Sequence, residues 1–122
     1  AVDATGLCAD FEAKYFATLA ADAGIHRLWY DLRNQALFDG SFRSDVLEIE
    51  ERREDMIWRV VSRYCELRGT TPALDKASAY ILLDGIFQRA LLHHLAGNAA
   101  EIAAAHVQLP AAFALLDCPT PQ

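Results

Sequence analysis

The stretch DKASAYILLDGIFQRALLHHL, residues 75–95, decides the fold because it predicts a long helix that is apolar on two faces. A helix on a protein surface normally carries one apolar stripe and an opposite polar face. One face of this helix holds Tyr80, Leu83, Phe87, Ala90, Leu91 and His94. A second face holds Leu82, Gly85, Ile86, Arg89, His93 and Ala96. A chain of 122 residues offers few elements to cover both faces, so we expect a second copy of the protein to cover one.

Composition indicates one compact domain spanning residues 1–122. Hydrophobic residues make up 53% of the chain against 23% charged, which argues against disorder. No run approaches the roughly 20 apolar residues that span a bilayer, so we expect no membrane association. The three cysteines are far apart and lack zinc or disulfide spacing, which indicates free thiols and a cytoplasmic protein.

Apolar periodicity and punctuating residues predict further helices on both sides of this stretch. The segment at 75–95 belongs to a helix that starts with Thr71 as its cap and Pro72 in the first position, and that ends at Gly97. Pro110 interrupts the last helix, which must kink there or restart as a sixth short one. No segment alternates long enough to predict a strand, and the tail 118–122 is expected to fray. The other expected helices span residues 7–22 (ended by Gly24), 25–38, 41–68 and from the Asn98 cap onward.

These features predict an all-α fold, an antiparallel bundle of five or six helices. The net charge of −6 repels a phosphate backbone, so residues 1–122 should not bind nucleic acid by themselves. The sequence contains no phosphate-binding loop, no nucleophile elbow and no Glu-x-x-His spacing. We therefore expect no metal, no cofactor and no catalysis. His26 and His106 lie near predicted helix ends and are expected to face solvent.

Aromatic side chains on the inward stripes leave two interpretations open: they fill a bundle core, or they line a cavity for an apolar ligand. Arg53 lies on the predicted buried stripe of its helix, where an unpaired guanidinium would be costly. We expect it to form a salt bridge with Glu50 or Asp84. The alternative is an acid group on a ligand.

Two patterns resemble the C-terminal regulatory domain of the TetR family of bacterial transcriptional repressors. The first is IHRLWYDLRNQALFDGSFRSDVLEIEERREDMIWRVV, residues 25–61, and the second is YILLDGIFQRALL, residues 80–92. The resemblance covers about residues 11–116. It implies a homodimer formed by the last two long helices, here 71–96 and 98–116, and a pocket for a small effector. It also implies DNA binding only through an N-terminal helix-turn-helix domain, which this sequence does not contain, and effector binding that alters operator affinity.

Combining both arguments, we assign candidate residues to two sites. The effector, expected to be small and apolar or aromatic, would contact Trp29, Leu32, Arg53, Met56, Val60, Tyr64, Tyr80, Leu83 and Phe87. Gly85 marks the dimer face, because a glycine inside a helix costs about 1 kcal/mol relative to alanine and close helix approach would justify that cost. That interface would comprise Leu82, Gly85, Ile86, Arg89, His93, Ala104 and Gln108. The alternative function is a purely structural dimerisation module without a pocket; a small helical enzyme or metal protein is the third possibility.

Overall fold

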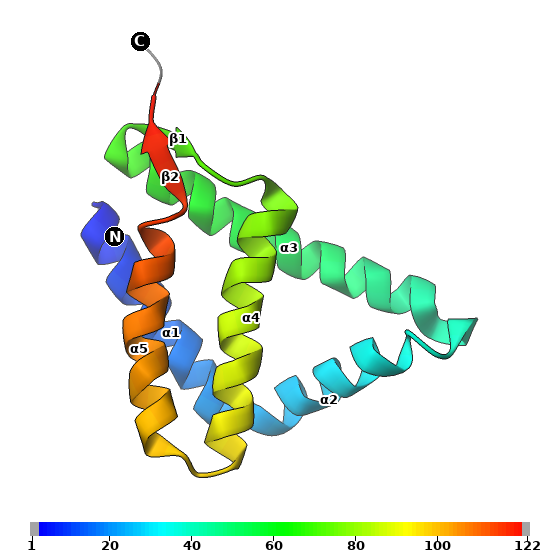
Figure 1. Cartoon of the computed structure of the whole chain (residues 1–122). Helices are drawn as coiled ribbons and strands as arrows, with labels where there is room; N and C mark the ends of the chain where they lie inside the picture. Colours follow the sequence, from blue (N-terminus) through cyan, green and yellow to red (C-terminus); the bar gives the residue numbers. More distant parts are fainter. Residues whose placement is uncertain (1–2, 121–122) are drawn as a thin grey trace.

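The computed structural model describes residues 3–120 and confirms the all-α fold (Figure 1). A short 3₁₀ turn, η1 (Gly40–Phe42), joins the second helix to the third. The described residues form five α-helices: α1 (Ala4–Ala21), α2 (Ala23–Gln35), α3 (Arg43–Arg68), α4 (Lys76–Leu95) and α5 (Ala99–Phe113).

Several helix ends follow directly from local sequence. Asp75 caps α4, its side chain accepting a hydrogen bond from Ser78 N at 2.7 Å, and Asn98 caps α5 through Glu101 N at 3.4 Å. Gly69 ends α3 with φ of 68°, a left-handed conformation that glycine adopts without a steric penalty. Gly24, in contrast, does not end α1, because α1 stops at Ala21 and Gly24 lies in the first turn of α2.

The last helix is continuous, so the alternative of a sixth helix after Pro110 is excluded and the count of five holds for the described residues. α5 runs through Pro110 to Phe113. Pro110 lies near the C-terminal end of α5 and is exposed there. Its carbonyl still accepts a hydrogen bond from Ala114 N at 3.2 Å, so the helical bonding continues beyond the proline.

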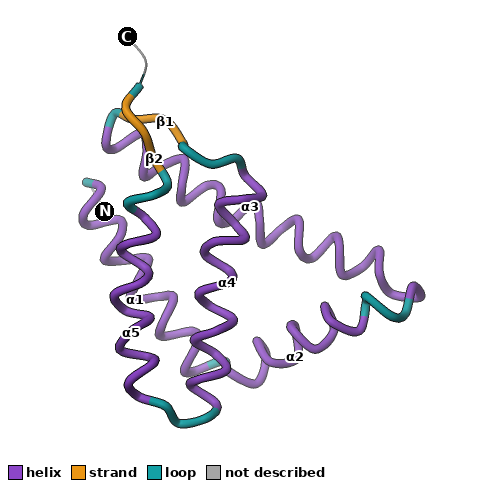
Figure 2. Tube along the Cα trace, viewed as in Figure 1, coloured by secondary structure: helices purple, strands orange, loops and turns teal. Residues whose placement is uncertain are grey.

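A small antiparallel strand pair corrects two further predictions. β1 (Thr70–Pro72) pairs with β2 (Asp117–Pro119), with Thr71 opposite Cys118 (Figure 2). Thr71 and Pro72 therefore lie in a strand and do not begin α4. The predicted fraying also fails for residues 118–120, since Thr120 Oγ1 donates to Gly69 O at 3.1 Å; residues 121–122 lie outside the described part of the chain.

The helices are arranged in two groups (Figure 1). α4 and α5 form an antiparallel hairpin with α1 beside it, and the α4–α5 contact is the most extensive between any two elements. α2 and α3 run outward from this group and meet at η1, like two sides of a triangle. The fold is thus less regular than a simple antiparallel bundle.

α4 has one buried face, as predicted, and one apolar exposed face. Its buried face contains Tyr80, Leu83, Phe87, Ala90 and Leu91. On the opposite side, Ile81 and Leu92 are 68% and 65% exposed.

The apolar residues of α2 differ in burial. Trp29 and Tyr30 are buried, as is Ala36 directly after the helix, whereas Ile25 and Leu28 are exposed.

Candidate functional site

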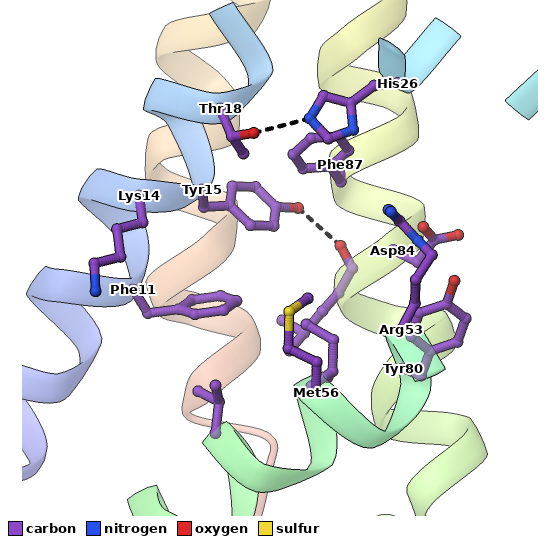
Figure 3. A pocket seen from close by; sticks show the side chains of 13 residues that line it. Phe11, Lys14, Tyr15, Thr18, His26, Arg53, Met56, Tyr80, Asp84 and Phe87 are labelled. Carbon is purple, nitrogen blue, oxygen red and sulfur yellow. Dashed lines mark hydrogen bonds between the residues drawn. The ribbon is translucent and has the colours of Figure 1, made fainter. Parts of the chain in front are cut away.

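A cavity of about 420 Å³ opens between α1, α3 and α4, with one side chain from α2 (Figure 3). Ligand pockets in proteins are typically concave, mostly apolar and equipped with a few polar groups that orient the ligand. This cavity has that composition. Its lining is Phe11, Lys14, Tyr15 and Thr18 from α1, His26 from α2, Arg53, Met56, Ile57 and Val60 from α3, and Tyr80, Leu83, Asp84 and Phe87 from α4.

Six of the nine residues assigned to a pocket from sequence lie around this cavity: Arg53, Met56, Val60, Tyr80, Leu83 and Phe87. The other three, Trp29, Leu32 and Tyr64, are not part of its lining. The Trp29 ring lies under the Arg53 guanidinium, 5.3 Å from its centroid, and Tyr64 packs edge-on against Phe113 with centroids 5.2 Å apart. Both aromatic rings are therefore core residues. Leu32 is half-buried on α2.

The sequence assignment missed the contribution of α1. Phe11 and Tyr15 lie on the apolar stripe that predicts this helix, so they were recognisable as inward-facing but not as cavity residues. His26, expected in solvent, is half-buried and packs edge-on against Phe87 at 4.8 Å. Which helices surround a cavity depends on their crossing, and no local pattern encodes that. The other missed lining residues are Lys14, Thr18, Ile57 and Asp84.

One wall of the cavity is aromatic and held in place by a buried hydrogen bond. Tyr15 packs edge-on against Phe87 with ring centroids 4.9 Å apart, and Phe11 lies 5.5 Å from Tyr15. The Tyr15 hydroxyl donates to the carbonyl of Leu83 at 2.8 Å (Figure 3). This bond ties α1 to α4 and holds the Tyr15 ring in the cavity wall.

The opposite side is polar, where Arg53, Tyr80 and Asp84 gather (Figure 3). The expected salt bridge from Arg53 to Glu50 or Asp84 is not formed in the described part of the chain. Arg33 forms ion pairs with both acids instead, with its Nη1 at 2.8 Å from Asp84 and 3.2 Å from Glu50. That prediction was wrong because Arg33 approaches the same acids from α2, a tertiary contact invisible in the sequence.

Two polar atoms beside the cavity are buried without a hydrogen-bond partner among residues 3–120: Arg53 Nε and the Tyr80 hydroxyl. Native proteins pair nearly all of their buried polar groups, so such atoms call for an explanation. Both can donate a hydrogen bond. Two unpaired donors on the polar side of an otherwise apolar cavity suit a ligand with an acceptor.

Burial and neighbouring charges also set the protonation of the lining. Burial raises the pKa of Tyr80 and the nearby Asp84 carboxylate adds to the rise, while the adjacent Arg53 guanidinium opposes it. Burial lowers the pKa of His26 below its ordinary 6.5, and the positive charge of Arg53 lowers it further. Near neutral pH, Tyr80 therefore keeps its proton and His26 is uncharged.

The residues assigned to a dimer interface divide into two sets. Gly85, Arg89 and Gln108 are exposed. Leu82, Ile86, His93 and Ala104 are half-buried, and the first two pack against the core. Arg89 forms an ion pair with Glu101 at 2.8 Å, so part of the proposed interface lies at the seam between α4 and α5 of one subunit. Ile81, Leu92 and Val107, which are apolar and exposed on α4 and α5, were not among the assigned residues.

Metal sites, membrane-spanning helices and similarity to known proteins also bear on the kind of site. Within residues 3–120, no three His, Cys, Asp or Glu side chains are grouped so as to hold a metal ion. Among the same residues, no helix combines the length and apolarity needed to cross a membrane. Comparison with family models, with curated proteins and with solved structures gives no match to this chain.

Proposed function

We propose that this chain is the effector-binding and dimerisation domain of a cytoplasmic transcriptional repressor of the TetR type. The observation that carries the proposal is the cavity of about 420 Å³, which combines aromatic walls with unpaired hydrogen-bond donors in an all-α domain. DNA binding would belong to a helix-turn-helix domain outside residues 1–122. The three free cysteines agree with a reducing compartment.

Dimerisation is supported by the outward face of the α4–α5 hairpin. Ile81, Leu92 and Val107 are 68%, 65% and 71% exposed on these two helices. Gly85 lies between Ile81 and Leu92 on the same side of α4, and a Cβ at this position would meet no described atom within 4 Å. The subunit's own packing therefore does not require this glycine. Close approach of a second copy, with two hairpins forming a four-helix bundle, would account for it.

The proposed mechanism is a shift between two dimer geometries. A ligand in the cavity contacts α1, α3 and α4 together, so it favours the geometry in which these helices fit it best. The shift is limited by the difference in affinity for the two states. Because α4 carries both cavity residues and the proposed interface, it would transmit the change to the DNA-binding domains of the parent protein.

The dimer is tested by replacing Gly85 with leucine and measuring molar mass by light scattering after gel filtration. The open space around Gly85 means that the monomer accommodates the side chain, whereas a closely packed dimer does not. We expect a dimer for the wild type and a folded monomer for Gly85→Leu. Gly24→Leu is the matched control, because Gly24 is also helical and open but lies on α2. A monomeric wild type, or a dimeric Gly85→Leu protein, would overturn this part of the proposal.

A structural dimerisation module without a ligand is the second candidate. It is favoured by Trp29 and Tyr64, which the sequence placed at a pocket and which pack in the core. A wild-type dimer whose melting temperature no apolar compound raises would support the module. A ligand-induced rise would support the effector domain, because a ligand that binds only the folded state stabilises it.

A further inference from the structure

Arg53 is a half-buried cation with no ion pair among residues 3–120. Its guanidinium stacks on Trp29 at 5.3 Å and its Nε has no hydrogen-bond partner in the described chain. A buried polar atom without a hydrogen-bond partner is costly, and a charged group in such a setting is normally paired. Asp84 and Glu50, the acids expected from the sequence to pair with Arg53, are both bound by Arg33, at 2.8 Å and 3.2 Å.

Tyr80 supplies a second donor beside the first. Its hydroxyl is buried and unpaired, and Figure 3 places it with Arg53 on one side of the cavity. A carboxylate has two oxygens that accept hydrogen bonds and pairs well with a guanidinium. One oxygen for Arg53 and one for Tyr80 would satisfy both buried donors.

The charge of the lining favours an anion over a cation. Lys14, Arg53 and Asp84 are the charged side chains that line the cavity, two positive and one negative, which leaves one net positive charge. The Asp84 carboxylate is already occupied, since it accepts hydrogen bonds from Tyr30 at 2.7 Å and from Arg33 at 2.8 Å. An anion thus meets an unpaired cation, whereas a cation would have to compete with Arg33 for Asp84.

We propose that the cavity binds an aromatic carboxylic acid as its anion, with the carboxylate at Arg53 and Tyr80 and the ring against Phe11, Tyr15 and Phe87. This inference rests on the proposed effector-binding function and specifies its ligand class. At about 30 Å³ for a water-sized group, the volume of about 420 Å³ holds on the order of a dozen non-hydrogen atoms. A naphthalene or similar fused ring bearing one carboxylate has this size.

Three probes of nearly equal shape separate charge from apolar fit: 2-naphthoate, the neutral 2-naphthamide and the cationic 2-naphthylmethylammonium. Affinity is measured by calorimetry with the whole chain. Met56 is the single methionine of the sequence and lines the cavity, so its ¹³C-labelled methyl group gives one NMR signal that reports occupancy. We expect 2-naphthoate to bind about tenfold or more tightly than either analogue and to shift the Met56 signal.

The variants Arg53→Gln and Tyr80→Phe each remove one donor. We expect Arg53→Gln to weaken 2-naphthoate binding by about tenfold or more and to leave 2-naphthamide binding nearly unchanged. Arg52→Gln is the matched control: it removes the same charge from the adjacent position, where the side chain is exposed and pairs only weakly with Glu48 at 3.9 Å. Tyr80→Phe should weaken 2-naphthoate binding in the same direction while retaining the ring.

The outcomes separate this inference from the function on which it rests. If 2-naphthamide or the ammonium probe binds as tightly as 2-naphthoate, or if Arg52→Gln weakens binding as much as Arg53→Gln, the carboxylate inference is overturned while the ligand pocket stands. If none of the three probes binds or shifts the Met56 signal, the inference is overturned and the effector-binding function loses its support. Selective loss in Arg53→Gln and Tyr80→Phe supports both.

Discussion

Replacing Arg33 with methionine tests the partly buried charge network beside the polar side of the cavity. Arg33 is 22% exposed and donates to Asp84, Glu50 and Gln88 at 2.8, 3.2 and 3.1 Å. The Asp84 side chain is only 9% exposed, so without Arg33 its charge is left with one hydrogen bond, from Tyr30. The methionine retains most of the apolar stem, which restricts the change to the lost charge.

The expected cost follows from burial. Breaking a fully buried ion pair costs about 3–5 kcal/mol and an exposed one less than about 1 kcal/mol. For this partly buried pair we expect about 2 kcal/mol. The entropy of unfolding, about 2.1 cal/mol/K per residue, amounts to about 0.26 kcal/mol/K for 122 residues. The melting temperature should therefore fall by about 8 °C.

The assay is thermal unfolding followed by circular dichroism at a fixed protein concentration, because an oligomer's melting temperature depends on concentration. Arg27→Met is the control, since it removes a charge from an exposed position of the same helix. It should change the melting temperature by no more than about 2 °C. An Arg33→Met protein as stable as the Arg27→Met protein would refute the reasoning, because the network would then contribute nothing to stability.

Three further predictions concern the fold and its response to pH. Leu109→Ala should lower the free energy of unfolding by about 2–5 kcal/mol, because Leu109 is 1% exposed and its truncation leaves a cavity; urea denaturation measures this, and a loss under about 1 kcal/mol would contradict the packing described. Gly69→Ala should destabilise the protein by about 1 kcal/mol since its φ is positive, whereas Gly24→Ala in α2 should stabilise it by about 0.5–1 kcal/mol; equal effects in urea would argue against the Gly69 conformation. The folded-state pKa of His26 is lowered, so its contribution to stability is complete above the unfolded pKa of about 6.5 and is lost as pH falls through the lower folded value. Between about pH 7 and about pH 5 the wild type should therefore lose more stability than His26→Gln, and equal losses would exclude this role.

Local sequence predicted the helices well where the signal lies within a few residues. The buried face of α4 follows from a periodicity of apolar side chains, and the ends at Asn98 and Gly69 follow from cap chemistry that involves only neighbouring backbone groups. The start of α4 was misplaced because Thr71 and Pro72 also read as a helix start. In the structure they form a strand instead, because they pair with residues 117 and 118, which are distant in sequence.

The candidate site was predicted only in part, for the same reason. Arg53, Tyr80 and Phe87 lie on inward stripes that the sequence shows, and they line the cavity. The contributions of Phe11 and Tyr15 depend on how α1 packs beside α3 and α4, which periodicity along one helix does not specify. The expected ion pair of Arg53 is absent because α2 places Arg33 beside the same two acids, Asp84 and Glu50.

The order of residues 75–95 was enough to establish a helix with apolar side chains on more than one side. The packing of the whole chain then settled what those sides do: one is buried in the core and cavity, while Ile81 and Leu92 remain exposed on the other. This division arises because helix formation and amphipathicity depend on neighbours within one or two turns, whereas burial depends on which distant helices meet that surface. Packing among residues 3–120 therefore leaves the side of α4 that carries Ile81 and Leu92 exposed.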